Sequence, residues 1–304
     1  MKSIALLDGG LGQEINTRSS ADASHSLWSV KVMQDEPDIV VRVHEDFIKA
    51  GARVLTLNNY TASIPRLSRF GMQDKLKETH QLAIDLMNKA VENSATNRSE
   101  INIAGCLMPL AASYVASEAL GYEKSYDQYC RLVEVQINAV DVFLAETISN
   151  IAEARAAADA LASFELPAYI GLTLNDDLSN TLRSGERLED AIDQLIKSNI
   201  EAIMINCCFP ESIDNALPIL RESGLKFGGY ANGFTSIDAL SPGATVDGLQ
   251  ARKDLTPDAY SQHALKWADA GAVIVGGCCE IGPAHIAHLN KSLLKAGYVS
   301  EKLC

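Results

Sequence analysis

The chain has 304 residues, 47% of them hydrophobic and 21% charged, which is typical of a soluble globular enzyme with a large core. Its formal net charge of −13 argues against a partner with a phosphate backbone, so no nucleic-acid binding is expected. No apolar stretch approaches the roughly 20 residues of a membrane span, and the apolar run after Met1 is too short for an export signal. We therefore expect no membrane association and a cytoplasmic location, in which the seven cysteines stay reduced.

Apolar runs alternate with amphipathic stretches along the chain, the pattern of parallel strands joined by crossover helices. The first run, residues 4–7, predicts a buried strand that ends at Asp8-Gly9-Gly10, and the polar stretch 16–25 predicts a loop. Further strands are expected at residues 53–57, 101–105, 140–145, 168–172, 202–205, 226–230 and 272–275. Helices are expected at residues 37–50, 76–91, 151–162, 188–197, 211–222 and 283–295, and from about residues 125 and 257. The irregular segment 231–255 is expected to be a loop.

Eight expected strands, with no composition shift to mark a domain boundary, favour an α/β fold. We predict a single (β/α)8 TIM barrel over residues 1–304. An open, doubly wound sheet is the alternative, because periodicity does not distinguish a closed sheet from an open one. In a barrel the active site lies at the C-terminal ends of the strands. The residues that follow each strand are therefore the candidates for chemistry.

Cysteines gather at two of those strand ends. Asn206-Cys207-Cys208 follows the sixth strand, and Gly276-Gly277-Cys278-Cys279 follows the eighth. A disulfide between neighbours is geometrically awkward, and barrel closure places these strands two apart, so Cys207 is expected to reach Cys278 and Cys279. Three thiolates with one open position make a zinc site of the catalytic kind, with metal–sulfur distances near ~2.3 Å. The two glycines are expected to leave room for the metal and a substrate.

Filling the core is the alternative role for any free cysteine, because cysteine behaves as a small hydrophobe. We expect that role for Cys208. Cys106 follows the third strand without a partner pattern, and Cys130 and Cys304 lie in a helix and at the chain end. The six histidines fall mostly on helices or loops, where solvated or capping roles are expected rather than metal ligation. The metal ligands are therefore expected to be Cys207, Cys278 and Cys279 alone.

A metal held by three thiolates activates water poorly but accepts a soft fourth ligand well. A substrate thiol bound there loses its proton at neutral pH and stays nucleophilic, which points to alkyl transfer onto a thiol rather than hydrolysis. Other residues at the strand ends suit an amino-acid substrate: Glu146 and Asp8 for its ammonium group, the Gly9 and Gly10 amides for its carboxylate, and Asn58 and Asn232 as weaker candidates. The alternatives are a turn role for Asp8, helix capping for Glu146, and local loop hydrogen bonds for the asparagines.

Taken together, Asp8-Gly9-Gly10-Leu11-Gly12, Asn206-Cys207 and Gly276-Gly277-Cys278-Cys279 resemble the zinc- and homocysteine-binding barrel of the homocysteine S-methyltransferases. That barrel also occurs in betaine–homocysteine methyltransferase and in cobalamin-dependent methionine synthase. The resemblance implies that Cys207, Cys278 and Cys279 hold Zn²⁺ and that homocysteine's sulfur takes the open position. It also implies that Asp8 and Glu146 bind the amino group, and that a methyl donor meets the activated sulfur in line to give methionine. The expected partners are these small molecules, and homo-oligomer formation is left open.

The sequence departs from the family pattern after the third strand. Family members that use S-methylmethionine carry a Gly-Pro-Tyr-Gly type stretch there, whereas this chain has Gly105-Cys106-Leu107-Met108-Pro109. A sulfonium such as S-methylmethionine is the first expectation for the donor. Two alternatives are kept: a barrel metalloenzyme that acts on another thiol or on a carbonyl substrate, and a non-catalytic module that binds zinc or homocysteine.

Overall fold

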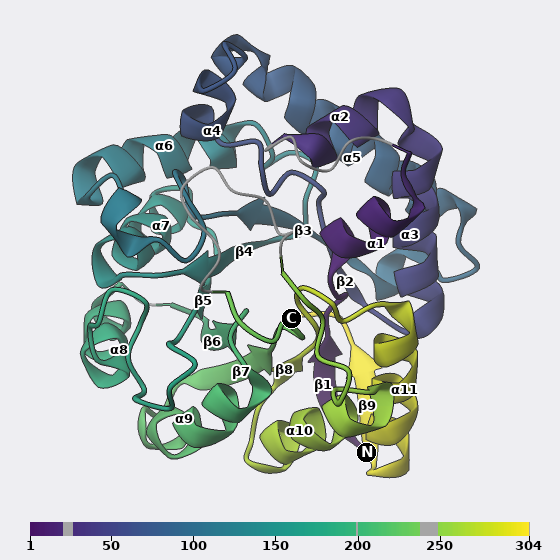
Figure 1. Ribbon diagram of the computed structural model, residues 1–304, viewed down its shortest axis with the longest axis vertical. Coiled ribbons are helices and arrows are strands. Elements are labelled where there is room, and N and C mark those ends of the chain that lie inside the picture. The colour runs from purple at the N-terminus through teal and green to yellow at the C-terminus, as the bar shows by residue number, and fades with distance from the viewer. Residues whose placement is uncertain (21–26, 199, 238–248, 304) are drawn as a thin grey trace.

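The computed structural model describes residues 1–20, 27–198, 200–237 and 249–303. Helices and strands alternate along almost the whole chain (Figure 1). The strands are β1 Lys2–Leu6, β2 Val54–Thr56, β3 Asn102–Leu107, β4 Val142–Ile148, β5 Tyr169–Leu172, β6 Ala202–Asn206, β7 Lys226–Tyr230, β8 Ile274–Val275 and β9 Tyr298–Glu301. The α-helices are α1 Leu11–Arg18, α2 Trp28–Asp35, α3 Pro37–Ala50, α4 Ile64–Ser68, α5 Leu76–Asn93, α6 Tyr122–Glu134, α7 Ile151–Ser163, α8 Leu188–Lys197, α9 Pro210–Glu222, α10 Pro257–Asp269 and α11 Pro283–Lys295.

All strand pairs in the ladder are parallel, in the order β2-β3-β4-β5-β6-β7-β8-β1-β9. The strands curl around a common centre with helices outside them, as in a TIM-like barrel (Figure 1). Between β1 and β2 there is one isolated parallel bridge, Leu7 to Val54. Two hydrogen bonds accompany it: Arg53 N donates to the Leu6 carbonyl at 2.8 Å, and Asp8 N donates to the Val54 carbonyl at 3.0 Å.

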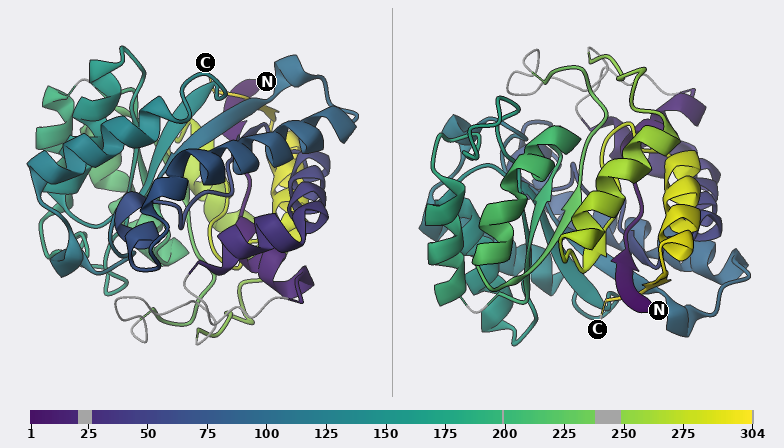
Figure 2. Two further views of the ribbon diagram at one scale, coloured as in Figure 1. Left: turned by 90° about the horizontal axis from the view of Figure 1, so that it is seen from above. Right: turned by 90° about the horizontal axis from the view of Figure 1, so that it is seen from below.

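The ninth strand explains why β1 and β2 touch only briefly. The amide of Lys2 donates to the Gly297 carbonyl at the start of β9, and the amide of Asp8 donates to β2. Even-numbered amides of β1 therefore face one edge, which β9 occupies along the first half of the strand and β2 at its end. Both chain termini consequently lie at the same end of the molecule (Figure 2). The sequence pattern did not predict β9.

Local sequence accounts for most element boundaries. Pro37 stands at the first turn of α3, and Gly51 ends that helix with φ of 109°, a left-handed conformation that favours glycine. The prediction of a loop over 16–25 was wrong at its start, because residues 16–18 belong to α1, and residues 21–26 lie outside the described part. The short helices α2 and α4 were also missed. The predicted loop 231–255 is confirmed where it is described, because residues 231–237 and 249–255 belong to no helix or strand, and residues 238–248 lie outside the described part.

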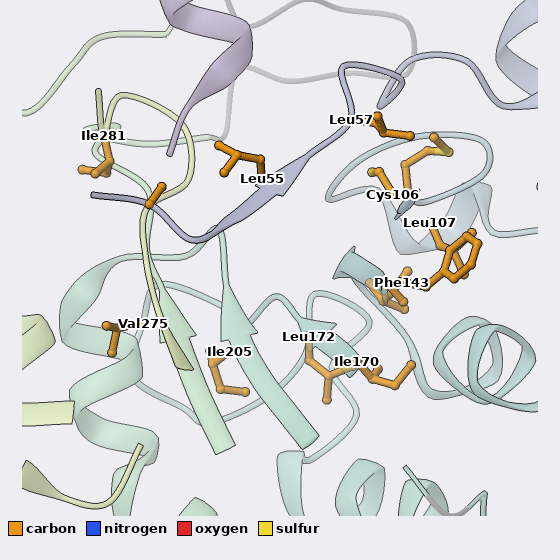
Figure 3. Close-up of a cluster of buried hydrophobic side chains, with 14 of the residues drawn as sticks. Leu55, Leu57, Cys106, Leu107, Phe143, Ile170, Leu172, Ile205, Val275 and Ile281 are labelled. Atoms are coloured by element: carbon orange, nitrogen blue, oxygen red, sulfur yellow. The ribbon is translucent and has the colours of Figure 1, made fainter. Parts of the chain in front are cut away.

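Alternate residues of the strands belong to two separate apolar clusters. One cluster, which includes Leu55, Ile205 and Val275, packs between the strands and the surrounding helices (Figure 3). The second contains side chains from successive strands and from Leu303: Ala5, Leu7, Val54, Ala104, Val142, Leu144, Tyr169, Ala202, Met204, Tyr230, Ile274 and Leu303. The second cluster packs on the inner face of the curled strands, so this face is a packed core and the ends of the strands are the places left for a site.

Two expectations about side-chain environment are settled by burial. His44 on α3 and His80 on α5 are fully buried, so the expected solvated role is wrong for both. Burial lowers the pKa of His44 to about 3 and that of His80 to about 4, which keeps both rings neutral. Among the described helices, none combines the length and the hydropathy that crossing a bilayer requires.

Candidate functional site

A cavity of ≈ 220 Å³ lies at the carboxyl ends of the strands. It brings together side chains that are far apart in the sequence: Asp8 after β1, Asn58 after β2, Glu146 in β4, Cys207 after β6, and Cys278 with Cys279 after β8. Parallel strands place all their carboxyl ends at one edge, which is why these residues converge. Of the sequence-predicted site residues, only Asn232 does not line this cavity.

The three predicted metal ligands form one cluster. The Sγ atoms of Cys207, Cys278 and Cys279 all lie within 4.8 Å of one another, a group that can hold a metal ion. Cys207 Sγ is 2.6 Å from Cys278 Sγ and 3.8 Å from Cys279 Sγ. Strand order confirms the reason given from sequence, because β7 alone separates β6 from β8. The donors are three soft thiols facing a cavity, which suits a thiophilic metal with an open position.

The backbone of Cys207 is held in an unusual conformation. Its φ of 52° is left-handed, which costs a non-glycine residue energy and marks a functional site when the surroundings enforce it. Its amide donates to the Tyr230 carbonyl at 3.0 Å. Its carbonyl accepts from Asn232 Nδ2 at 2.9 Å and from Thr173 Oγ1 at 3.2 Å. Asn232 therefore contacts the main chain of a predicted ligand and aims Cys207 at the cavity.

The structure gives a different reason from the expected one for the two glycines before Cys278. A Cβ on Gly276 would lie 2.5 Å from Leu7 Cβ, and one on Gly277 would lie 2.3 Å from Ile281 Cγ2. The space on the Cβ side of both glycines is thus filled by protein, so close packing explains why glycine is needed there, although Gly277 also lines the cavity. They let the Cys278-Cys279 turn pack closely against the end of β1, and the Cys278 amide then donates to the Ala231 carbonyl at 3.0 Å.

Two carboxyl groups in the cavity resist ionisation. Burial raises the pKa of Asp8 to about 7, although the Thr56 amide, 2.9 Å from Oδ2, and the Thr56 hydroxyl favour the charged form. Burial raises the pKa of Glu146 to about 8, and the nearby charges of Asp8 and Cys207 add to the effect. The buried Oε1 of Glu146 has no hydrogen-bond partner among the described residues. Such a pair is poised to gain a cationic ligand.

The glycines after β1 are less available than expected. The Gly10 amide already donates to the Ile281 carbonyl at 2.9 Å. A Cβ on Gly9 would lie 2.0 Å from that same carbonyl oxygen, so only glycine fits there. Asn58 lines the cavity, and its buried Nδ2 has no acceptor within the described chain. The Gly10 amide, which was expected to donate to a substrate carboxylate, is thus already bonded, whereas the Nδ2 group of Asn58 is available for such a bond.

Sequence reasoning missed Tyr114, which lies in the segment that follows β3. Its hydroxyl is 2.8 Å from Cys207 Sγ, and its φ of 65° is left-handed. The guanidinium carbon of Arg183 lies over its ring, 5.7 Å from the centroid. Although burial acts the other way, the hydrogen bonds from Cys278, Cys279 and Tyr114 lower the pKa of Cys207 well below that of a free thiol. The sole sequence signal was the departure from the family pattern in this segment.

Arg66 was also missed. It lies on α4 and lines the same cavity. Its Nη2 donates to the Pro109 carbonyl at 3.0 Å and to Ser113 Oγ at 3.1 Å, and its guanidinium carbon is 5.6 Å from the centroid of the Tyr60 ring. No local motif distinguishes this arginine from a surface one, because its hydrogen bonds go to a segment more than 40 residues away.

Comparison with known proteins points in one direction. A family model described as homocysteine S-methyltransferase matches residues 5–293, a range that contains every residue lining the cavity. Homocysteine S-methyltransferase 1 of Brassica oleracea var. italica is 28% identical and covers 95% of this chain and 93% of the relative. Selenocysteine methyltransferase of Astragalus bisulcatus is 27% identical, with 95% and 92% covered. The metallated form of the homocysteine methyltransferase MmuM from Escherichia coli has a TM-score of 0.78 at 26% identity, with 95% of this chain and 96% of that chain covered.

Proposed function

The chain belongs to the homocysteine S-methyltransferase family and is a methyltransferase of the EC 2.1.1 class, and from this premise we propose that it converts homocysteine to methionine. The proposed donor is a sulfonium, S-methylmethionine in the first place. The carrying observation is that one cavity joins three convergent thiols to the carboxyl group of Glu146, whose buried Oε1 has no hydrogen-bond partner among the described residues. A metal held by soft ligands would bind the thiol of the substrate, and the carboxylate would bind its ammonium group.

The proposed metal is Zn²⁺, held by Cys207, Cys278 and Cys279. The donor set fits, because three thiols within 4.8 Å of one another match the cysteine-rich sites that zinc prefers. When bound, the metal would lower the pKa of a coordinated substrate thiol and keep its sulfur nucleophilic. The hydrogen bonds of Asn232 and Thr173 to the Cys207 carbonyl would keep that ligand in place. A reducing compartment such as the cytoplasm would keep the three thiols free.

Homocysteine would bind along the strand ends. Its ammonium group would lie between Glu146 and Asp8, where the charge would lower both carboxyl pKa values and ionise them. Its carboxylate would meet the Gly9 amide and the Nδ2 group of Asn58. Gly10 would shape this segment through its bond to Ile281 rather than donate to the ligand. Asn232, which does not line the cavity, would act on Cys207 and not on the substrate.

The proposed transfer is a single in-line displacement. The thiol of homocysteine first loses its proton to solvent, and a lone pair of its sulfur then forms the new bond to the methyl carbon. The carbon–sulfur bond of the donor breaks, its electron pair returns to the donor sulfur, and the sulfonium becomes a neutral thioether. Residues of the cavity would hold both sulfurs in position and exclude water.

Positioning of this kind requires a rigid frame. We infer that residues 1–304 form one unit and that the Leu7 to Val54 bridge closes the eight-stranded barrel.

The test combines a metal assay with a panel of donors and acceptors. Purified protein should contain one zinc per chain by elemental analysis and should methylate homocysteine from S-methylmethionine. Betaine and methylcobalamin test other donor classes. Selenocysteine joins the acceptors, because a relative of almost equal identity is named selenocysteine methyltransferase. Absence of zinc, or of methyl transfer with every pair, would sink the proposal. Tight homocysteine binding without turnover would instead indicate a binding module, and activity on a carbonyl substrate alone would indicate a different metalloenzyme.

A further inference from the structure

The cavity carries charges of opposite sign on different walls. Asp8, Glu146 and the three thiols lie at the strand ends. Arg66 lines the cavity from α4, next to Tyr60 and to Ser113 of the segment after β3. The proposed function uses the first group and leaves Arg66 without a role. A guanidinium in a cavity that is to receive a cationic donor calls for an explanation, because like charges repel.

Arg66 is fixed in place by uncharged groups, and Glu153 acts on its charge only from beyond ion-pair distance. Nε and Nη2 donate to the Pro109 carbonyl at 3.3 and 3.0 Å, Nη2 also donates to Ser113 Oγ, and the guanidinium lies over the Tyr60 ring. These partners are all uncharged. In the described part of the chain, Arg66 forms no ion pair, and its Nη1 group donates to no acceptor. Burial lowers the pKa of Arg66 and the neighbouring cation Arg69 acts in the same direction, while Glu153 offsets the fall only in part.

The position of Arg66 relates it to the reacting sulfur. Ser113, which accepts from Arg66, directly precedes Tyr114, whose hydroxyl touches Cys207 Sγ. A ligand with its sulfur near the thiols can therefore extend along Tyr114 and Ser113 and reach Arg66 with its other end. Homocysteine's own polar groups already have partners at the strand ends, so the ligand on this second wall is the donor.

We propose that Arg66 binds the α-carboxylate of the methyl donor, which makes the donor a zwitterionic amino-acid sulfonium rather than a bare cation. This inference rests on the proposed function. The sulfonium lies toward the thiols and carboxyls, and the carboxylate forms charge-assisted hydrogen bonds with Nη1. Because Pro109, Ser113 and Tyr60 already orient the guanidinium, little side-chain entropy is lost on binding. A sulfonium without a carboxylate leaves the guanidinium unpaired beside a like charge and is rejected.

The experiment is a double-mutant cycle in which one change is made in the Arg66 side chain and the other in the carboxylate of the donor. Transfer to homocysteine is measured for wild type, Arg66→Met and Arg66→Lys, with S-methylmethionine and with its α-carboxamide. Wild type should prefer the carboxylate donor by about 10- to 100-fold in kcat/KM, the range for a hydrogen bond to a charged group. Arg66→Met should reduce that preference to less than about threefold by losing rate only with the carboxylate donor. Arg66→Lys should fall between them, and the KM for homocysteine should stay within about threefold in every variant.

Arg155→Met is the matched control. Arg155 also lies over a tyrosine ring, 5.3 Å from the centroid of Tyr122, but it does not line the cavity. Its donor preference should equal that of wild type, and melting temperatures verify that each variant folds. Equal loss of both donors in Arg66→Met would overturn the inference, since it would mean that Arg66 only anchors the Pro109–Ser113 segment. A rise in the homocysteine KM alone would overturn it too, because Arg66 would then bind the acceptor.

Calorimetric binding of S-methylmethionine separates this inference from the proposed function. If no variant transfers a methyl group, the proposed function fails, and the affinities still decide the role of Arg66. A drop of about 10-fold or more from wild type to Arg66→Met, with the carboxamide bound equally by both, supports the inference. Equal affinity of the two proteins for S-methylmethionine refutes it.

Discussion

The cavity has two walls that are built in different ways. The strand-end wall comprises Asp8, Glu146, Cys207, Cys278 and Cys279. Backbone ladders and main-chain bonds hold it, as at Cys207, whose amide and carbonyl are both engaged. The loop wall comprises Tyr60, Arg66, Ser113 and Tyr114, and side-chain hydrogen bonds and ring contacts hold it.

Because the two walls are held differently, we assign the reaction to the strand-end wall and recognition of the donor to the loop wall. A wall fixed by the sheet keeps its geometry when loop residues change, so it suits the thiols and carboxyls that the reaction needs. A wall made of loop side chains can change with few substitutions, so it suits recognition of the donor. Substitutions on the strand-end wall should therefore remove the reaction or acceptor binding, whereas those on the loop wall should alter rate or selectivity more mildly.

The largest effect is expected for Cys278→Ser on the strand-end wall. A hydroxyl is a far poorer ligand for a thiophilic metal than a thiolate, so zinc content should fall below stoichiometric and activity to below about 0.1% of wild type. Elemental analysis and methyl-transfer assays measure both. Cys130→Ser, on a helix away from the cavity, is the control and should behave as wild type. Full activity of Cys278→Ser would remove the metal from the proposed reaction.

The second-largest effect is expected for Glu146→Gln, which should weaken binding of the acceptor homocysteine. The amide cannot offer a charge to the ammonium group, so the homocysteine KM should rise by about 10- to 100-fold while the donor KM changes little. In wild type the homocysteine KM should rise as pH falls from 9 to 6, because Glu146 and Asp8 take up protons near pH 8 and pH 7. In the variant the rise near pH 8 should disappear and the one near pH 7 remain. A profile unchanged by the substitution would place the ammonium group elsewhere.

The same variant should also change stability in a pH-dependent way. The folded-state pKa of Glu146 lies above the usual glutamate pKa of 4.5, so folding favours the neutral form. The associated stability is present below that value and is lost as pH rises through about 8. Glu146→Gln stays neutral, so its melting temperature should match wild type near pH 4.5 and exceed it increasingly toward pH 8.5. A constant difference across this range would contradict the buried charge.

Asn232→Ala tests whether the strand-end wall depends on its backbone support. Loss of the bond to the Cys207 carbonyl should lower zinc affinity by about 10-fold, since residues that orient a metal ligand are typically worth 10- to 100-fold. The KM values for both substrates should change less than about threefold in the zinc-saturated protein. A competitive chelator titration measures the affinity. A large rise in the homocysteine KM with unchanged zinc affinity would return Asn232 to the role of a substrate contact.

Tyr114→Phe should have the smallest effect, because it removes one hydrogen bond and keeps the ring under Arg183. We expect kcat to fall by about three- to tenfold with zinc content unchanged, in keeping with the loss of a single hydrogen bond of 0.5–1.5 kcal/mol. Tyr60→Phe, which loses a bond to Ser113 but none to a thiol, is the comparison. Loss of zinc in Tyr114→Phe would show that the loop wall also supports the metal site.

The sequence by itself determined the strand-end wall. Short apolar runs ended by Asp8, Cys207 and the Cys278-Cys279 pair are local patterns, and parallel strands place their carboxyl ends at one edge. Alternation of strands and helices therefore sufficed to predict that three distant cysteines meet. Helix boundaries followed equally local signals, such as Gly51 after α3.

Only the tertiary structure decided the rest. The function of Gly277 depends on Ile281 filling the space beside it, and the position of β9 depends on which edge of β1 is vacant. Arg66 and Tyr114 acquire their roles through side-chain contacts between segments far apart in the chain. Periodicity and motif spacing describe neighbours along the chain. These contacts join residues whose spacing along the chain does not predict their distance in space, so the loop wall forms only when the chain is folded.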